Sequence, residues 1–215
     1  MPESLAGYEC GLKAIGASYT TATTESMPFC PLIIVPGFAG GEARGARKIR
    51  DLAYRGSTVL IESGALFDDP SEGEAHRRIL RSHFSIDTKA PIALRDHREE
   101  RSKANLATRK LLTLRESIDA PMSSLPYVDF VWPHLTKIRD FSRAVPVYSD
   151  DAQVVAVSPG GIPVAVRRRI GRGTMIFLGS PVGPSILAGD PEAREWLYGV
   201  VSQSYKASCL LGHPQ

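Results

Sequence analysis

The first part of the chain alternates between helix-like and strand-like patterns of apolar residues. Apolar side chains three and four residues apart predict helices over 3–16, 41–55 and 70–84. Continuous apolar runs at 31–37 and 57–62 predict strands that are covered on both faces, as in a parallel sheet. The order strand, helix, strand, turn, helix predicts a βαβα unit whose strands run parallel.

The last third of the chain predicts further strands and a terminal helix. Two strand-like runs at 153–157 and 162–166 flank a Ser-Pro-Gly-Gly turn, which indicates a hairpin. A buried strand is predicted over 174–178, and a helix begins at Pro191 with Asp190 as its N-cap. All these elements together predict an α/β fold, a three-layer α/β/α sandwich. Its sheet is expected to be mainly parallel, with the hairpin near its C-terminal edge.

One domain is predicted for the whole chain, residues 1–215, because neither a repeat nor a low-complexity linker divides it. The region 87–150 is less regular than the rest. Its charged stretch 95–115 is typical of a solvated face, and the prolines that follow indicate loops and short edge strands. We therefore expect this region to be a surface excursion from the domain.

The charge balance indicates an ordinary globular protein. Lys and Arg number 26 and Asp and Glu 23, so the formal net charge is +3, and 43% of the residues are hydrophobic. This apolar content excludes a disordered chain, and the small excess of charge gives no reason to expect nucleic acid. The arginines at 167–169 predict a solvated sheet edge that discourages strand addition. No apolar run has the ~18 residues needed to cross a bilayer, and no signal-peptide pattern opens the chain, so a cytoplasmic protein without a membrane partner is predicted.

The cysteines and the acidic residues predict neither a metal site nor a cofactor. Cys10, Cys30 and Cys209 form no CxxC pair and no Cys/His cluster, so a zinc site and a disulfide framework are not expected. The acidic residues in the segment 68–74 are interpreted as charges that complement the dipole at the start of a helix.

Two separate parts of the chain resemble a known superfamily. The segment 32–37 (LIIVPG), a helix, and the segment 57–64 (STVLIESG) are similar to the class I glutamine amidotransferase-like superfamily. The segment 169–180 (RIGRGTMIFLGS) and the helix after Asp190 resemble non-amidotransferase relatives, such as the trimerisation domain of some β-galactosidases. The resemblance implies a flavodoxin-like or amidotransferase-like sandwich. The superfamily opens with a central strand, whereas only two residues precede the first helix here, so that strand is expected to be missing or replaced.

The resemblance places Ser63 at the position of the superfamily's nucleophile. Catalytic members carry a cysteine there, in the sharp turn between a strand and a helix, and take their base from a later His-Pro-Glu motif. This chain has Ser63 in the turn and Gly179-Ser180-Pro181 in place of that motif. A serine hydroxyl needs a base within hydrogen-bond reach, so the resemblance implies a site that has lost its catalytic machinery.

The expected site is a cleft where three strands end, between 37–41, 63–67 and 179–185. Exposed backbone N–H groups after a strand can bind an anion, and ligands of α/β sheets gather at the carboxyl ends of strands. The predicted ligand-binding residues are Gly37, Gly40, Gly41, Gly64, Ala65 and Ser180. The leading hypothesis is a non-catalytic domain that binds a small molecule or assembles with a second copy or a partner protein.

An enzyme is the alternative. In that hypothesis Ser63 is the nucleophile of a hydrolase or amidotransferase-like enzyme, and its base is His76, His83 or His134. Of these histidines, His76 is the first candidate. The tryptophans Trp132 and Trp196 are interpreted as packing anchors.

Overall fold

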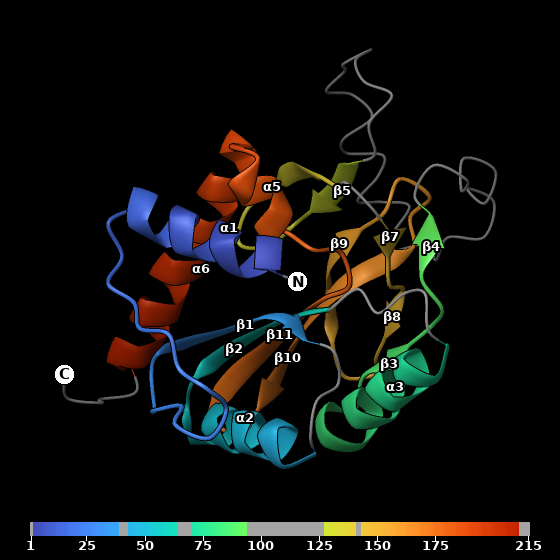
Figure 1. Cartoon of the computed structure of the whole chain (residues 1–215), viewed down its shortest axis with the longest axis horizontal. Coiled ribbons are helices and arrows are strands. Elements are labelled where there is room, and N and C mark those ends of the chain that lie inside the picture. The colour runs from blue at the N-terminus through green and yellow to red at the C-terminus, as the bar shows by residue number, and fades with distance from the viewer. Residues whose placement is uncertain (1, 39–42, 64–69, 94–126, 141–142, 211–215) are drawn as a thin grey trace.

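The computed structural model describes residues 2–38, 43–63, 70–93, 127–140 and 143–210. They form a seven-stranded sheet with helices on both of its faces (Figure 1). The helices are α1 (Pro2–Ala14), α2 (Ala43–Arg55), α3 (Pro70–Phe84), α5 (Gly183–Leu187) and α6 (Pro191–Leu210). In spatial order the strands are β1 (Leu32–Phe38), β2 (Thr58–Ser63), β11 (Gly173–Leu178), β10 (Pro163–Ile170), β9 (Gln153–Val157), β5 (Tyr127–Phe130) and β6 (Thr136–Arg139). Two small ladders pair β3 (Asp87–Thr88) with β8 (Val147–Tyr148) and β4 (Ile92–Ala93) with β7 (Arg143–Ala144).

The sheet is mixed, so the expected three-layer sandwich around a mainly parallel sheet is wrong. Only β1, β2 and β11 run parallel to one another. The remaining neighbours, from β11 through β10, β9 and β5 to β6, are all antiparallel, and the sheet curls into an open half-barrel (Figure 1). The physical reason lies in the connections, because strands joined by tight turns can pair only antiparallel.

The predicted βαβ unit is present at one end of this sheet. Ile33 of β1 lies beside Val59 of β2 in parallel register, with α2 as the connection. Gly56 ends α2 with a φ of 127°, a conformation that favours glycine. At the start of α6 the backbone N–H of Glu192 donates to Asp190 Oδ1 at 3.0 Å, so the predicted N-cap is confirmed.

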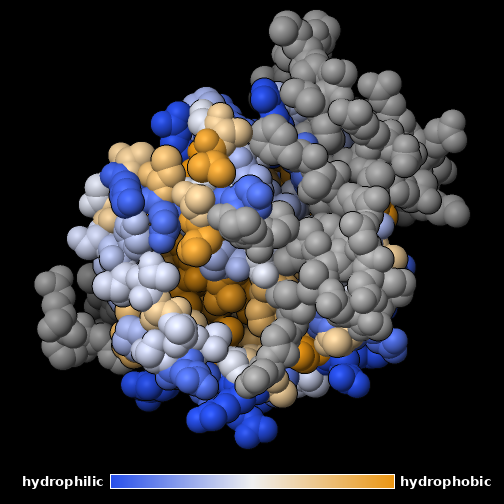
Figure 2. All heavy atoms as spheres, viewed as in Figure 1, coloured by the Kyte–Doolittle hydropathy of each residue, from blue (hydrophilic) through white to orange (hydrophobic). Residues whose placement is uncertain are grey.

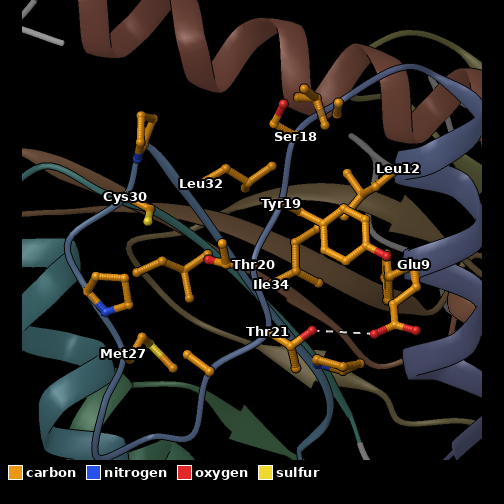
Figure 3. A pocket seen from close by; sticks show the side chains of 18 of the residues that line it. Glu9, Leu12, Ser18, Tyr19, Thr20, Thr21, Met27, Cys30, Leu32 and Ile34 are labelled. Carbon is orange, nitrogen blue, oxygen red and sulfur yellow. Dashed lines mark hydrogen bonds between the residues drawn. The ribbon is translucent and has the colours of Figure 1, made fainter.

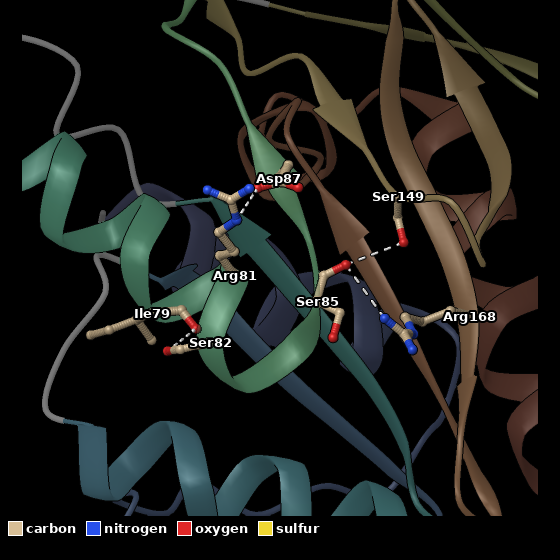
Figure 4. A network of polar contacts seen from close by, with 7 residues as sticks. All are labelled: Ile79, Arg81, Ser82, Ser85, Asp87, Ser149 and Arg168. Atoms are coloured by element: carbon tan, nitrogen blue, oxygen red, sulfur yellow. Dashed lines mark hydrogen bonds and ion pairs between the residues drawn. The ribbon is translucent and has the colours of Figure 1, made fainter.

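The predicted hairpin forms, but it lies inside the sheet. β9 pairs with β10, and β10 is covered on its other side by β11. The interpretation of the arginines 167–169 as an exposed edge is therefore wrong. Arg168 Nη1 instead donates to the carbonyl of Phe84 at 2.9 Å and to that of Ser85 at 3.4 Å, where it satisfies carbonyls at the end of α3 (Figure 4).

Two apolar cores lie on opposite faces of the sheet. α1, α5 and α6 cover one face, where the ring of Trp196 packs 5.3 Å from that of Phe130. The Trp196 indole N–H also donates to the carbonyl of Trp132 at 2.9 Å, which confirms both tryptophans as packing anchors. α2 and α3 cover the other face through residues such as Ile49 and Leu80.

Candidate functional site

β2 ends in two buried polar residues that belong to different faces of the sheet. Glu62 is 0% and Ser63 1% exposed. Successive side chains of a strand point to opposite faces. Leu60 belongs to the core under α1 and Ile61 to the core under α2, so Glu62 lies on the α1 side and Ser63 on the α2 side.

Glu62 binds two helices to the end of β2. Its Oε2 accepts hydrogen bonds from the Tyr8 hydroxyl at 2.7 Å and from the backbone N–H groups of Val182 and Gly183 at 2.9 and 3.0 Å. Tyr8 belongs to α1, and the two amides lie at the start of α5. One carboxyl group thus connects three elements that are far apart in the sequence.

The protonation of this cluster follows from its burial. Burial raises the pKa of Glu62, while hydrogen bonds from Gly183, Tyr8 and Val182 oppose that rise. Burial, and then the nearby Glu62, raise the pKa of Tyr8 well above its ordinary value, so the phenol keeps its proton and donates. The geometry gives Glu62 a structural task, which is to satisfy buried donors.

Two glycines let α1 approach α5 above Glu62. A Cβ atom added to Gly7 would lie 1.9 Å from the carbonyl oxygen of Gly183, and one added to Gly183 would lie 2.6 Å from Cα of Ser4. Real Cβ atoms do not come this close to backbone atoms. The glycines therefore permit a backbone contact that holds α1 over the end of β2.

Ser180, a predicted ligand-binding residue, follows β11 on the way to α5. It is buried, and its Oγ donates to Asp140 Oδ2 at 2.5 Å. The hydroxyl thus satisfies a buried carboxylate of the chain itself. Its role toward a ligand stays a prediction.

His76, the first candidate base, lies on the same side of the sheet as Ser63 but in an aromatic environment. Its ring centroid is 5.6 Å from that of Phe38 and 6.4 Å from that of Phe177. Burial, and then the positive charge of Arg77, lower the pKa of His76 to about 4. Neither ring nitrogen has a hydrogen-bond partner among the described residues, so the structure shows no hydrogen bond between His76 and Ser63.

The other two histidines lie in different surroundings. The ring of His83 is near the end of α3, 6.4 Å from the ring of Phe84. His134 packs against Gly199 of α6, on the face of the sheet opposite to Ser63. His76 and His83 thus belong to α3 on the face that carries Ser63, whereas His134 lies on the other face.

Several predicted site residues lie outside the described residues, namely Gly40, Gly41, Gly64 and Ala65. The charged stretch 95–115 is outside them too. Gly37 is described and has a φ of 62° within β1. Over the described ranges, no three His, Cys, Asp or Glu side chains come together as metal ligands, and no helix has the length and apolar content to cross a membrane.

The sequence interpretation missed the role of Glu62. The sequence carried one signal of this role: Glu62 is an acidic residue at the end of a strand that is predicted to be buried, and a buried carboxylate requires partners. Those partners, Tyr8 and the amides at 182–183, are 54 to 121 residues away in the chain, and no local pattern reveals them.

No family model and no curated protein matches the chain. Several solved structures of glycosidases are similar to the chain in fold. The exo-β-1,4-mannosidase Op5Man5 from Opitutaceae bacterium strain TAV5 has a TM-score of 0.57 at 14% identity, over 94% of this chain and 31% of that one. A catalytic mutant of Gan42B, a GH42 β-galactosidase from G. stearothermophilus, has a TM-score of 0.57 at 12% identity, over 83% and 23%. A cold-adapted β-galactosidase from Rahnella sp. R3 has a TM-score of 0.61 at 11% identity, over 93% and 26%.

These likenesses correct the predicted family. The chain spans less than a third of each glycosidase, and at such low identity the similarity shows the fold alone. The expected membership of the class I glutamine amidotransferase-like superfamily, and the flavodoxin-like type with it, is wrong, since the similar structures are glycosidases with a curled mixed sheet. The apolar and glycine patterns behind that expectation are common to many strand-helix-strand units. The β-galactosidase part of the resemblance agrees with these structures at the level of fold.

Proposed function

We propose that the chain is a non-catalytic domain that assembles with a second copy of itself through its helical layer α1, α5 and α6. The observation that carries the proposal is the exposure of large apolar side chains on these three helices. Leu5 of α1 is 41% exposed, Leu187 of α5 45%, and Tyr198 and Tyr205 of α6 58% and 48%. Tyr198 and Tyr205 are seven residues apart and share one face of α6.

The physical argument is the cost of leaving such side chains in water. Single exposed apolar residues are normal, but several on one layer favour a protein interface, and tyrosine is enriched in interfaces. Glu62 holds two helices of this layer, α1 and α5, to the sheet, so that part of the layer offers a partner a fixed surface. The formal net charge of +3 opposes the approach of a second copy only weakly.

Two further observations support a non-catalytic role. Glu62 and Ser180 are engaged in internal hydrogen bonds at the strand ends, and in each similar glycosidase the matched part is a minority of the chain. The small share of each glycosidase that is matched favours an accessory role for this fold. The predictions of a cytoplasmic location, and of no nucleic-acid or membrane partner, remain part of the proposal.

The test compares two exposed tyrosines on opposite faces of the molecule. Tyr198→Ser removes an aromatic ring from the proposed surface, whereas Tyr54→Ser removes a ring of similar exposure, 54%, from α2. Light scattering after size exclusion should show a mass above that of one chain for the parent and for Tyr54→Ser. The dissociation constant of the Tyr198→Ser oligomer should be about tenfold higher than that of the parent, as expected for the loss of ~1.4 kcal/mol. Equal dissociation of both variants would refute the proposed surface.

A second candidate function is acyl transfer by Ser63. The observation that favours it is the position of Ser63 and His76 on one face of the sheet, near the carboxyl ends of the strands. If it holds, the parent hydrolyses ester, amide or glutamine substrates, and Ser63→Ala does not. If the parent shows no turnover above that of Ser63→Ala, the enzyme hypothesis is rejected and the assembly proposal stands.

A further inference from the structure

A pocket of about 360 Å³ lies at the free edge of β1, away from the strand ends. Its walls are α1, the segment 17–31, β1 and α6, and the segment 18–21 runs opposite the strand (Figure 3). Figure 2 shows the hollow, with an apolar floor, over the part of the molecule where β1 lies. Of the site residues predicted from the sequence, those that the structure describes (Gly37, Ser63, His76 and Ser180) do not line it. The volume is within the range of small-molecule sites.

The lining of this pocket is mainly apolar, with hydroxyl groups such as those of Ser18, Thr20 and Thr21 and one carboxylate. Leu12, Met27, Leu32 and Ile34 supply apolar walls. Glu9 is the single acidic side chain among the described residues that line the pocket, and no basic side chain joins it there. A ligand with an apolar body would therefore meet one negative charge.

Glu9 is weakly engaged. Its Oε1 accepts a hydrogen bond from the Thr21 hydroxyl at 3.4 Å, which is long for such a bond (Figure 3). No described lysine, arginine or histidine forms an ion pair with it. Because a charged donor makes a shorter and stronger hydrogen bond to a carboxylate than a hydroxyl does, a cation would displace Thr21 at this position.

We propose that this pocket binds a small molecule that has an apolar, chain-like or aromatic body and a protonated amine. The body occupies the space between Leu12, Met27 and Ile34, and the ammonium group donates to the carboxylate of Glu9. Burial of the apolar body supplies most of the affinity, and the ion pair selects the head group. The proposed site does not require the assembly, but it shares Leu5 and Tyr205 with the assembly surface.

The chain carries its own reporter for this site. Cys30 is half-buried and lines the pocket, whereas Cys10 is exposed and does not line it. A bound ligand should slow the alkylation of Cys30 and leave that of Cys10 unchanged. Mass spectrometry of the two cysteine peptides measures both rates in one sample.

The experiment uses three probes with the same phenylalkyl body and different head groups: 4-phenylbutylamine, 4-phenylbutanol and 5-phenylpentanoate. The amine should protect Cys30 at a concentration about tenfold lower than the alcohol, as expected for a charge-assisted hydrogen bond, and the acid should protect least. Equal protection by all three probes, or protection by none, would overturn the proposal without any mutation. Protection that rises with protein concentration and without probe would overturn it in favour of a second copy as the occupant.

Glu9→Gln and Glu3→Gln provide the matched variants. Both residues belong to α1, but Glu3 is exposed and does not line the pocket. Glu9→Gln should bring the amine and the alcohol to equal protection, and Glu3→Gln should keep the tenfold preference that the ion pair predicts. A preference that survives in Glu9→Gln would place the recognition of the amine elsewhere. The probes and the variants are compared at a protein concentration at which the chain is monomeric, and only the control without probe is run at rising protein concentrations, so that the outcome of the assembly proposal does not affect the comparison.

Discussion

The buried ionisable groups on the two faces of the sheet have different surroundings. On the α1 side, the buried carboxyl of Glu62 meets a hydroxyl and two backbone amides. On the α2 side, the buried imidazole of His76 meets the rings of Phe38 and Phe177 and no hydrogen-bond partner among the described residues. Both faces have an apolar core, but the buried ionisable group has polar contacts on the α1 side and aromatic contacts on the α2 side.

The difference teaches that burial alone does not tell what an ionisable group does. Glu62 has a raised pKa, so the folded state holds its proton more tightly than the unfolded state does, and this contribution to stability is lost as the pH rises through the folded pKa. His76 has a pKa lowered to about 4, so its contribution is present above its ordinary pKa and is lost as the pH falls. The two faces therefore respond to pH with opposite signs.

The largest expected effect comes from removing the polar contacts on the α1 side. Glu62→Leu leaves the Tyr8 hydroxyl and two buried amides without an acceptor, so the free energy of unfolding should fall by about 4 kcal/mol. Urea denaturation measures it, with Glu195→Leu on the exposed side of α6 as a control expected within about 0.5 kcal/mol of the parent. A loss below about 1 kcal/mol would show that Glu62 does not hold the helices.

The next effect compares one glycine from a helix on each face. Gly7→Ala places a Cβ atom against the Gly183 carbonyl and should destabilise the protein by about 3 kcal/mol. For Gly45→Ala in α2, the nearest described atoms belong to Thr24, at the ordinary contact distance of 3.4 Å, so this variant should stabilise the protein by about 0.5 kcal/mol through helix propensity. Thermal unfolding of both variants provides the measurement. Similar stabilities for the two would contradict the tight contact between α1 and α5.

The α2 side is tested by its pH dependence. As the pH falls from about 7.5 to about 5, the lowered pKa of His76 should reduce the free energy of unfolding of the parent by about 2 kcal/mol. His76→Phe should not show this decrease, because phenylalanine does not titrate. Urea denaturation of both proteins at the two pH values isolates this difference, since Glu62 contributes equally to each. An identical pH dependence in parent and variant would mean that His76 is protonated at no cost in the folded state.

The smallest effect concerns the connection between β10 and α3. Arg168→Met removes the hydrogen bonds to the carbonyls of Phe84 and Ser85 and should cost about 1 kcal/mol. Arg169→Met is the matched control, because that side chain is exposed and, among the described residues, donates to the nearby Gly171 carbonyl at the long distance of 3.5 Å. Equal unfolding free energies for the two variants would show that Arg168 does not stabilise the end of α3.

The sequence could predict the elements whose signals are local. The helix over 70–84, the cap at Asp190 and the parallel strands at 31–37 and 57–62 follow from periodicity and capping, and they are present. The extension of the sheet to β5 and β6 could not be predicted, because these strands are short and lie in a proline-rich region that gives no strand periodicity. β5 joins the sheet by pairing with β9, and β6 joins it by pairing with β5.

The candidate site was less predictable than the fold. Glu62 acts through partners from α1 and α5, and the pocket is assembled from four segments, so neither appears as a motif. The nucleophile position at Ser63 came from a resemblance to the wrong family. Its buried location and the aromatic surroundings of His76 became visible only when distant strands were brought together.

The central claim is that the helical layer of this domain joins two copies of the chain. Sedimentation equilibrium of the unmodified protein tests it most directly, at concentrations up to about 100 μM, because a homo-oligomer responds to its own concentration. We predict a mass that rises above the 23.3 kDa of one chain. A mass that stays at 23.3 kDa throughout that range would contradict the proposal.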